Sequence, residues 1–240
     1  MTTGLYIHIP FCKQKCNYCD FASFAGRENL VSAYLEALDK SAAVSPARKY
    51  TTLYVGGGTP SLLTAGQLEE LCGLIARYFG PVSHFEESTI EANPESLTAE
   101  KLSVLKRAGF SRISMGLQSF SDTELKTLGR VHTVQTFLAA YRAARQAGFD
   151  NINVDLIAGV PGQSLQSFLD GLKKLTALRP EHLSVYGLQI EEGTPFFERG
   201  IVCDQMLMRR MLEETHAYLQ EAGYHHYEIS NFALPGREAK

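Results

Sequence analysis

Short apolar runs alternate along the chain with longer segments in which apolar residues recur at helical spacing. The apolar runs are residues 5–9, 52–58, 88–94, 112–120, 151–161 and 182–190, and the helical segments are 29–43, 64–79, 99–108, 134–146, 164–178 and 204–221. Short runs bounded by turn residues are typical of buried strands, whereas a three-to-four-residue period is typical of amphipathic helices. The order of these segments predicts six βα units.

Several predicted helices carry start and stop signals. Thr98 precedes a predicted helix, and its hydroxyl can accept a hydrogen bond from a free backbone N–H there. Lys101 stands where a full capping box would have Glu or Gln. Gly109 and Gly148 follow predicted helices, where a left-handed cap favours glycine. One more extended segment is expected at residues 227–232.

Alternating strands and helices give a parallel sheet with right-handed crossovers. Eight βα units close a TIM barrel. Six predict an α/β fold with a partial (β/α)6, TIM-like barrel whose mouth can admit a large ligand. Chemistry in such folds takes place at the carboxyl ends of the strands. The residues to inspect are therefore 12–19 after the first strand, 56–60 after the second, and Glu91, Gln118 and Asp155.

The composition is that of an ordinary globular protein. The chain has 240 residues, of which 45% are hydrophobic and 20% charged, and its net charge is −3. A general nucleic-acid binder usually has an excess of basic residues. No apolar run reaches the roughly 18 residues of a membrane helix, and the N-terminus lacks the features of a signal peptide. We expect a cytoplasmic protein that binds no nucleic acid and meets a membrane only through a partner.

Three of the five cysteines, Cys12, Cys16 and Cys19, lie within eight positions with the spacing C-x3-C-x2-C. Structural zinc takes four ligands, usually in two separated pairs, so this is not a zinc-finger spacing, although His8 could add a fourth ligand. The compact loop suits an iron–sulfur cluster better. In a 4Fe–4S cluster, three thiolates leave one iron open, and an open metal position is where a substrate or cosubstrate binds.

The other two cysteines stand in apolar surroundings. Cys72 lies in a predicted helix, and Cys203 follows an Ile-Val pair. Both are interpreted as inert, buried or half-buried thiols.

Cys12, Cys16 and Cys19, with Tyr18 before the third cysteine, resemble the signature of the radical S-adenosylmethionine (SAM) superfamily. The resemblance implies a partial (β/α)6 barrel and a 4Fe–4S cluster whose open iron is chelated by the amino and carboxylate groups of SAM. It also implies an electron donor for the cluster. The chemistry implied is reductive cleavage of SAM to a 5′-deoxyadenosyl radical, which abstracts hydrogen from a substrate.

Other motifs are similar to those of the oxygen-independent coproporphyrinogen III oxidase family and its relatives, over a stretch from Tyr6 to about residue 232. The Gly-Gly-Gly-Thr-Pro segment at 56–60 resembles the loop that holds the SAM amino group. Similar motifs are IEANPE, MGLQSF, LGRVHT and NVDLIAGVPGQ. The resemblance implies cluster ligands Cys12, Cys16 and Cys19, and cofactor-binding residues Tyr6, Tyr18, Gly57, Gly58, Thr59, Glu91, Gln118, Arg130 and Asp155.

The chemistry of these side chains suits SAM. Carboxylates such as Glu91 and Asp155 suit its ammonium group and ribose diol, and the planar guanidinium of Arg130 suits its carboxylate. Gln118 can both donate to and accept from ribose hydroxyls. Tyr6 and His8 alternate with Leu5, Ile7 and Ile9, so we expect them to share one face of the first strand and to look into the barrel.

Other polar residues are expected to be structural or solvent-facing. His132 and the pair His225-His226 are interpreted as surface or capping residues. Lys13, Gln14 and Lys15 are interpreted as a solvated face of the cysteine loop.

Two features resemble the shorter relatives in this group, the heme chaperones of the HemW type. Phe21 stands where the oxidases carry a further cysteine, and the first strand begins near Gly4, with no N-terminal extension before it. This resemblance implies a protein that binds a cluster and SAM, carries heme as cargo and transfers it to acceptor proteins. Oxidation of coproporphyrinogen III, with a porphyrin ligand, is the alternative, and a zinc-binding or purely structural module is the third. Whether the protein is an enzyme stays open.

The same resemblance sets the expected domain organisation. Residues 1–232 are expected to form the radical SAM core barrel. Residues 233–240 are expected to begin a C-terminal region that is cut short here, because the relatives continue into a further domain with an H-N-x-x-Y-W segment and this chain contains no Trp.

Overall fold

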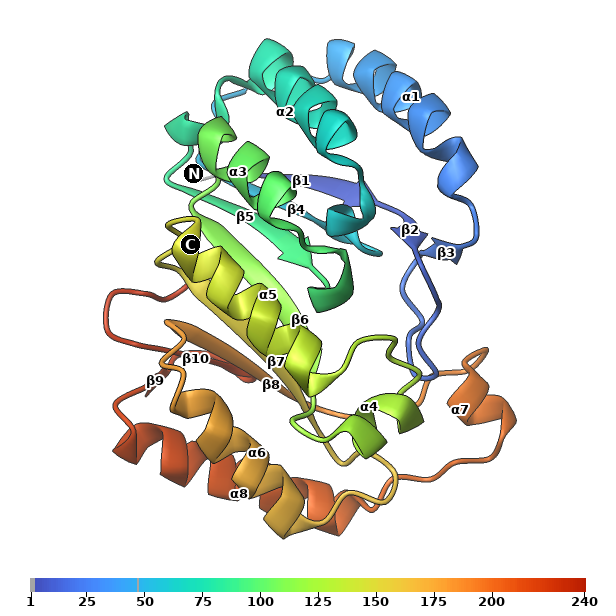
Figure 1. Ribbon diagram of the computed structural model, residues 1–240, viewed down its shortest axis with the longest axis vertical. Helices are drawn as coiled ribbons and strands as arrows, with labels where there is room; N and C mark the ends of the chain where they lie inside the picture. Colours follow the sequence, from blue (N-terminus) through green and yellow to red (C-terminus); the bar gives the residue numbers. More distant parts are fainter. Residues whose placement is uncertain (1–2, 47) are drawn as a thin grey trace.

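The computed structural model describes residues 3–46 and 48–240. Its main element is one sheet with the strand order β1-β4-β5-β6-β7-β8-β10-β9, in which the first six strands are parallel (Figure 1). These six are β1 (Gly4–Ile9), β4 (Thr52–Gly57), β5 (Glu87–Ala92), β6 (Arg112–Gln118), β7 (Ile152–Ala158) and β8 (His182–Gly187). The sheet ends in an antiparallel hairpin of β9 (His225–His226) and β10 (Asn231–Ala233).

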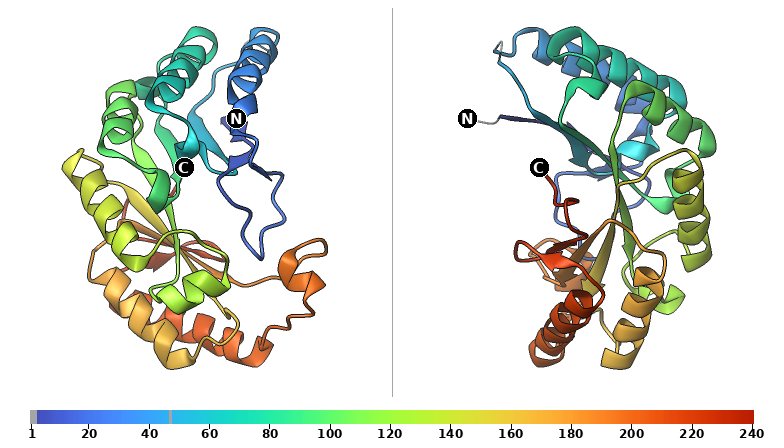
Figure 2. Two further views of the ribbon diagram at one scale, coloured as in Figure 1. Left: turned by 45° about the vertical axis from the view of Figure 1, so that its right-hand side comes forward. Right: turned by 90° about the vertical axis from the view of Figure 1, so that its left-hand side faces the viewer.

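Helices follow the parallel strands and lie on one side of the curved sheet, in a C-shaped arc (Figure 2). They are α1 (Val31–Ala43), α2 (Ala65–Phe79), α3 (Ala99–Ala108), α5 (Val134–Gln146), α6 (Leu165–Thr176) and α8 (Gln205–Glu221). The predicted fold class, a partial (β/α)6 barrel, is confirmed.

The shortest strands and helices were not predicted from the sequence. They are strands β2 (Phe11–Cys12) and β3 (Phe24–Ala25), helices α4 (Asp122–Thr127) and α7 (Pro195–Glu198), and the 3-10 helices η1 (Glu28–Leu30), η2 (Pro60–Leu62), η3 (Val82–His84) and η4 (Pro94–Ser96). Each spans too few residues to show a hydrophobic period.

The two faces of the sheet differ in polarity: the face toward the helices is apolar, and the inner face carries the polar side chains of the site. On β1, Ile7 and Ile9 are buried toward the helices, and Tyr6 and His8 point to the other face. The same alternation in the neighbouring strands, with Ile113, Met115 and other apolar residues in the main hydrophobic core, leaves polar side chains on the concave face. A parallel strand buried by apolar packing on both faces would read as nearly continuous hydrophobic sequence. The alternation indicates a face kept for polar contacts.

The predicted helix signals are confirmed in their local geometry. Thr98 Oγ1 accepts from the Lys101 N–H at 3.3 Å, and Gly109 caps α3 at a φ of 104°. The complete capping box belongs to α2 instead, where Thr64 and Gln67 exchange side-chain to backbone hydrogen bonds.

The single extended segment expected at residues 227–232 is wrong. The chain turns between β9 and β10, and Tyr227 N–H donates back to the Asn231 carbonyl at 3.4 Å. The Glu228 carboxylate explains the turn, because it accepts hydrogen bonds from the Ser230 N–H and the Asn231 side chain.

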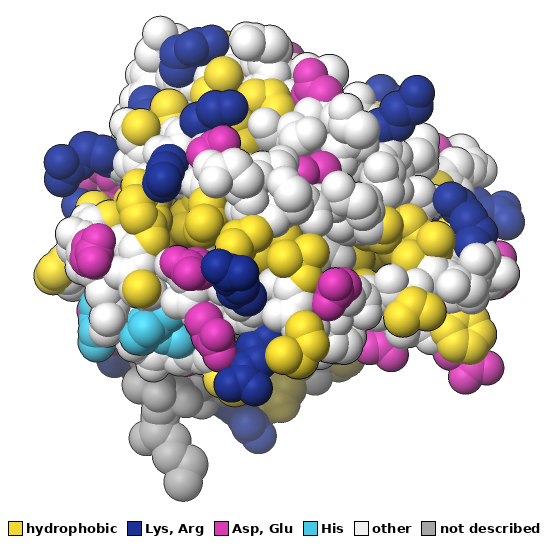
Figure 3. Space-filling view, turned by 90° about the horizontal axis from the view of Figure 1, so that it is seen from below, with side chains coloured by type: hydrophobic (Ala, Val, Ile, Leu, Met, Phe, Trp, Pro, Cys, Tyr) yellow, Lys and Arg dark blue, Asp and Glu magenta, His cyan; other side chains and the backbone are white. Residues whose placement is uncertain are grey.

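Within the described residues, no helix combines the length and hydrophobicity that a membrane crossing requires. On the face seen from below, acidic and basic side chains are interspersed, with apolar side chains between them and histidines gathered at one place (Figure 3).

Candidate cofactor site at the strand ends

The three clustered cysteines lie on the loop that follows β1. Cys12 is buried at the end of β2, and Cys16 and Cys19 are half-buried further along the loop. The Cys19 N–H donates to the Cys16 carbonyl at 3.3 Å, which folds the second and third cysteines into one turn. Burial is the main cause that raises the pKa of the Cys19 thiol.

The glycine loop after β4 packs directly against the cysteine loop. Gly58 N–H donates to the Ile9 carbonyl at 2.9 Å, and Thr59 N–H donates to the Phe11 carbonyl at 2.8 Å. The Thr59 hydroxyl lies 3.6 Å from Cys12 Sγ. An ideal Cβ on Gly58 would lie 2.7 Å from the Phe11 carbonyl oxygen and 3.0 Å from Cys12 Sγ. The two loops therefore approach closely only because residue 58 has no side chain.

Glu91 and the glycine loop are also joined directly. Glu91 Oε2 accepts from the Gly57 N–H at 3.0 Å, and Oε1 accepts from the Tyr54 hydroxyl at 2.8 Å. Gly57 has a φ of 118°, and an ideal Cβ there would lie 2.6 Å from the His8 ring. Burial is the largest influence on Glu91 and raises its pKa, against the lowering effect of these two hydrogen bonds. Tyr54 was not among the predicted site residues, although the alternation of β4 places it on the inner face.

Arg130 connects the loop after β6 to the cysteine loop. Its Nη1 lies 3.5 Å from Cys16 Sγ, and its Nη2 donates to Asn93 Oδ1 at 2.5 Å and to the Gly116 carbonyl at 3.0 Å. The Tyr18 hydroxyl is a further hydrogen-bond partner of this guanidinium. The pKa of Arg130 is raised: burial opposes its charge, but Tyr18, Cys16 and Glu95 beside it favour it more. Asn93 was also missed, and its place directly after β5 was the available signal.

Gln118 ends β6 in a left-handed backbone conformation, with a φ of 73°. This conformation is uncommon for a residue with a side chain. The pairing of β6 with β7 shifts its register between Gly116 and Gln118, so the chain bulges there. The bulge lies at the carboxyl end of β6, where Gln118 was expected from the sequence.

Asp155 lies on the inner face of β7, and its Oδ1 accepts from Asn153 Nδ2 at 2.6 Å. Burial, with a smaller effect from the nearby Glu91 charge, raises the pKa of Asp155 to about 6. The same inner face holds a buried His182, whose ring contacts Asn153 Oδ1 at 2.6 Å and the Tyr227 hydroxyl at 2.7 Å. Burial lowers the pKa of His182 to about 3, so this histidine is neutral at physiological pH.

Tyr6 and His8 lie on the inner face, as expected from their alternation. The His8 Nε2 atom is 2.8 Å from the Ala22 carbonyl, an acceptor, so Nε2 carries the proton and Nδ1 accepts from the Tyr6 hydroxyl at 3.1 Å. His8 therefore ties the end of the cysteine loop to β1. Tyr18 lies beside Arg130, and burial raises the pKa of its hydroxyl.

The interpretation of Lys15 as part of a solvated loop face is wrong. Its Nζ donates to the Phe21 carbonyl and to the carbonyl and hydroxyl of Ser23, so it clamps the loop from inside. Gln14 is likewise engaged, with Nε2 donating to the Gly129 carbonyl at 3.0 Å. Lys13 is exposed, as expected. Carbonyl groups in a tight turn attract an ammonium group, and the spacing alone did not show that turn.

The interpretation of His132 as a surface or capping residue is also wrong. His132 is buried, its Nε2 lies 3.1 Å from the Leu117 carbonyl, and its Nδ1 lies 3.4 Å from Glu95 Oε2. Burial opposes the charge of Glu95, yet its pKa is lowered because His132 and Arg130 favour the ionised form. His132 follows Arg130 by two positions, in the segment between α4 and α5.

The donor set at the loop suits an iron–sulfur cluster. The three thiols belong to one loop, the Arg130 guanidinium lies beside the Cys16 sulfur, and the Thr59 hydroxyl lies beside the Cys12 sulfur. Across residues 3–46 and 48–240, no three His, Cys, Asp or Glu side chains converge as ligands of a single metal ion. Because each thiolate of a cluster binds a different iron, cluster ligands need not converge on one point.

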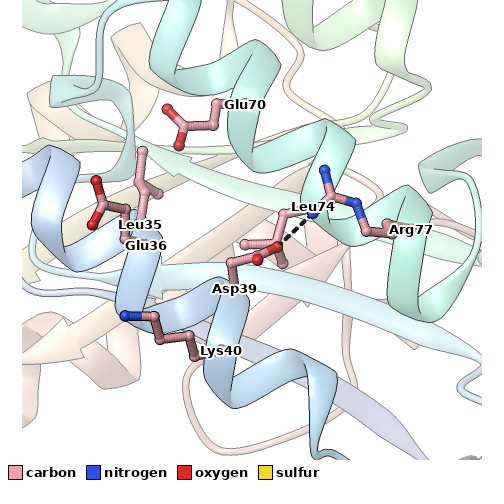
Figure 4. A pocket seen from close by; sticks show the side chains of 7 residues that line it. All are labelled: Leu35, Glu36, Asp39, Lys40, Glu70, Leu74 and Arg77. Carbon is pink, nitrogen blue, oxygen red and sulfur yellow. Dashed lines mark hydrogen bonds and ion pairs between the residues drawn. The ribbon is translucent and has the colours of Figure 1, made fainter.

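A hollow of about 280 Å³ lies elsewhere on the surface, between α1 and α2 on the helical side (Figure 4). Acidic and basic side chains line it, and Arg77 Nη1 pairs there with Asp39 Oδ1 at 2.8 Å. None of the predicted site residues lines this hollow.

The chain matches the family described as the Radical SAM superfamily over residues 6–175. It is 39% identical over 244 residues to the heme chaperone HemW of Bacillus subtilis (strain 168), which covers 98% of this chain and 64% of that protein. It is 41% identical over 244 residues to the heme chaperone HemW of Escherichia coli (strain K12), covering 99% and 64%. The chain thus spans about 64% of the length of these curated relatives.

Among solved structures, coproporphyrinogen III oxidase (HemN) from Escherichia coli, a radical SAM enzyme, superimposes with a TM-score of 0.88 at 31% identity. That match covers 98% of this chain and 56% of the oxidase. Methylornithine synthase (PylB), at 16% identity and a TM-score of 0.64, shares the fold.

Proposed function

The chain belongs to the radical SAM superfamily, and on that premise we propose that it binds a 4Fe–4S cluster and SAM and forms the barrel of a cytoplasmic heme chaperone. The observation that carries the proposal is the close packing of the three-cysteine loop on the glycine loop, through Gly58 and Thr59. This packing brings thiols together with backbone that a ligand can approach, at the carboxyl ends of parallel strands. Residues 1–232 are proposed as the core barrel, although its last strand, β10, runs to Ala233.

Each predicted site residue has a proposed role that follows from its place. Cys12, Cys16 and Cys19 hold the cluster. Gly57, Gly58 and Thr59 bind the amino-acid end of SAM, with Glu91 beneath Gly57. The guanidinium of Arg130 binds the carboxylate. The remaining SAM contacts are assigned to Tyr6, Tyr18, Gln118 and Asp155.

When bound, the cluster and SAM supply one-electron reduction of a sulfonium, with the electron taken from an external donor. The residues of this chain bind, orient and shield. Arg130 places its guanidinium 3.5 Å from Cys16 Sγ and so orients that part of the cysteine loop. Glu91 fixes the glycine loop through Gly57 and Tyr54, and so holds the backbone in one position. Asp155, with a pKa of about 6, is partly protonated near neutral pH until a cationic or hydroxyl-bearing ligand stabilises its charge.

The chaperone role rests on two observations. Several relatives at 35–41% identity are named heme chaperones, whereas one at 35% identity, from Bacillus subtilis, is named an oxygen-independent coproporphyrinogen-III oxidase-like protein. Phe21 stands where the oxidases carry a further cysteine, and its side chain is 64% exposed, so it supplies an apolar surface beside the cysteine loop and no thiolate. The proposed partners are heme, an acceptor protein that receives it, and a donor that reduces the cluster.

Oxygen-independent oxidation of coproporphyrinogen III is the second candidate. It is favoured by the TM-score of 0.88 to the Escherichia coli oxidase, which covers nearly the whole of this chain. It is disfavoured by Phe21, which cannot act as a ligand or redox group.

The two candidates separate in one experiment on anaerobically reconstituted protein. The chain is incubated with SAM, a reductant and coproporphyrinogen III, and 5′-deoxyadenosine and protoporphyrinogen are quantified. In parallel, the heme-loaded chain is mixed with an apo-globin, and heme transfer is followed by absorbance. We expect heme transfer without decarboxylated product. Steady formation of protoporphyrinogen, coupled to 5′-deoxyadenosine release, would replace the chaperone by the oxidase.

A further inference from the structure

Asn17 lies in the cysteine loop, between the second cysteine and Tyr18, and it joins that loop to the end of α4. Its backbone N–H donates to the Leu128 carbonyl at 2.9 Å, and its side-chain Nδ2 donates to the Thr127 carbonyl at 2.8 Å. Both acceptors are carbonyls at the carboxyl end of a helix, where the last carbonyls have no partner within the helix. Asn17 therefore satisfies the end of α4 with two donors.

The acceptors of Asn17 are used by a different segment, at α7. Its carbonyl accepts from the Phe196 N–H at 2.9 Å, and its Oδ1 accepts from Arg199 Nη2 at 3.0 Å. The backbone and side chain of one residue thus make four hydrogen bonds to two segments 110 to 182 positions away. Packing supports this contact, because Phe196 is buried in a small apolar cluster with Leu128, against which Tyr18 packs.

Asn17 connects segments that follow strands far apart in the sheet. The cysteine loop leaves the edge strand β1, whereas α4 follows β6 and α7 follows β8, further along the sheet order. Within residues 3–46 and 48–240 the sheet does not close, and β1 is its edge strand. Figure 2 shows the cysteine loop and α7 lying across the opening of the helical arc, and Figure 1 shows both beside α4.

A nearby glycine marks how close the approach is. Gly129 has a φ of 75°, and an ideal Cβ there would lie 3.1 Å from Asn17 Cγ. The chain after α4 can therefore pass beside Asn17 only in a conformation that favours glycine.

We propose that Asn17 is a positioning residue that locks the cysteine loop across the open mouth of the barrel, by tying it to the loops after β6 and β8. The lock takes the place of the strand pairing that a closed barrel would provide. It fixes Cys16 and Tyr18, the neighbours of Asn17, relative to the strand ends where the cosubstrate is proposed to bind. The inference rests on the proposed function only in that this loop holds a cluster.

The test compares four single variants and one double variant with the wild-type chain, all reconstituted anaerobically. Asn17→Ala removes both side-chain hydrogen bonds. Asn17→Asp keeps the acceptor for Arg199 but turns a carboxylate oxygen toward the Thr127 carbonyl. Arg199→Ala removes only the side-chain bond to the α7 segment and leaves the bond from the Phe196 N–H to the Asn17 carbonyl. Lys13→Ala is the matched control, because Lys13 lies on the same loop with an exposed side chain and makes no hydrogen bond within the described residues.

The first measurement is the rate at which a chelator removes iron from each protein. A net hydrogen bond is worth roughly a fivefold change, so Asn17→Ala should lose iron about 25-fold faster than wild type. Asn17→Asp should fall between them, and Lys13→Ala should match wild type. Combining the Asn17→Ala and Arg199→Ala changes should add nothing to Asn17→Ala alone, because Arg199 acts on the loop through Asn17.

The second measurement detects positioning as distinct from folding. The paramagnetic resonance spectrum of the reduced cluster is recorded with SAM added, and thermal unfolding is recorded on the same samples. We expect a heterogeneous spectrum for Asn17→Ala and a single species for Lys13→Ala, both recorded well below the unfolding temperature of either variant. For Asn17→Ala that temperature should fall by only about 4–8 °C. Wild-type iron retention and a wild-type spectrum in both Asn17 variants would overturn the lock. Failure of the wild-type chain to form any cluster would instead overturn the proposed function.

Discussion

Replacing Gly58 by alanine tests whether the glycine loop must touch the cysteine loop. The added methyl group would lie 2.7 Å from the Phe11 carbonyl oxygen and 3.0 Å from Cys12 Sγ. A backbone oxygen cannot rotate away as the end of a flexible side chain can. The loops are also held at this spacing by the hydrogen bond from Thr59 N–H to the same Phe11 carbonyl. The whole segment around Cys12 must therefore shift.

The size of the effect follows from the cost of overpacking. Inserting a methyl group into a tightly packed site costs about 1–3 kcal/mol. For a domain of this size, each kcal/mol lowers the unfolding temperature by roughly 2–4 °C, so we expect a fall of about 2–12 °C. The shift should also displace Cys12 from its place in the loop. Gly58→Ala should therefore hold less iron after reconstitution than its stability alone would predict.

Gly73→Ala is the matched control. Gly73 lies in the middle of α2, is exposed, and an added Cβ would meet no atom within 4 Å. Alanine in a helix interior is favoured over glycine by about 0.5–1 kcal/mol, so this variant should be more stable and keep its full iron content. Thermal unfolding and iron analysis measure both effects. If Gly58→Ala unfolds at the wild-type temperature and holds full iron, the close packing of the two loops has no role.

Two further predictions concern charged groups of the site. The pKa of Asp155 is raised to about 6 by burial, so the proton on this carboxyl stabilises the folded state fully below its unfolded pKa, and that contribution is lost as the pH rises through 6. Asp155→Asn should therefore make the cofactor-free protein more stable above pH 6, by up to about 3 kcal/mol, and leave it unchanged near pH 3.5. Urea unfolding at pH 3.5 and pH 8 measures this difference. Equal free energies of unfolding of variant and wild type at pH 8 would show that burial does not destabilise the ionised carboxylate. Arg130→Ala should weaken SAM binding about ten- to a hundredfold through the loss of a charged hydrogen bond. Equilibrium binding at the wild-type affinity would contradict the placement of the carboxylate at Arg130.

The regular part of the fold was predictable because its signal is local. Each parallel strand places apolar side chains such as Ile7 and Ile9 against the helices, and each helix repeats them every three to four residues, so both patterns lie within about fifteen residues. The positions of Cys12 and Gly58 at strand ends follow from that pattern and from the rule on where parallel folds place their ligands.

The contacts that hold the site together were not predictable because their partners are distant in the sequence. Nothing near Asn17 shows that its amide will meet Thr127 and Arg199. His132 was misread for the same reason, because its burial against Glu95 depends on how two strand-end loops pack. The short helix α7 has too few residues to show a period and is defined by its contacts.

The most direct test of the proposed cluster site is a metal analysis of the anaerobically reconstituted chain and of five cysteine-to-alanine variants. Iron, acid-labile sulfide and zinc are measured per chain, together with the change in the resonance spectrum of the reduced cluster when SAM is added. We predict an iron–sulfur cluster that responds to SAM in the wild type, Cys72→Ala and Cys203→Ala, and none in Cys12→Ala, Cys16→Ala or Cys19→Ala. Stoichiometric zinc in the wild type, or a cluster that survives in Cys16→Ala and is lost in Cys72→Ala, would contradict the central claim.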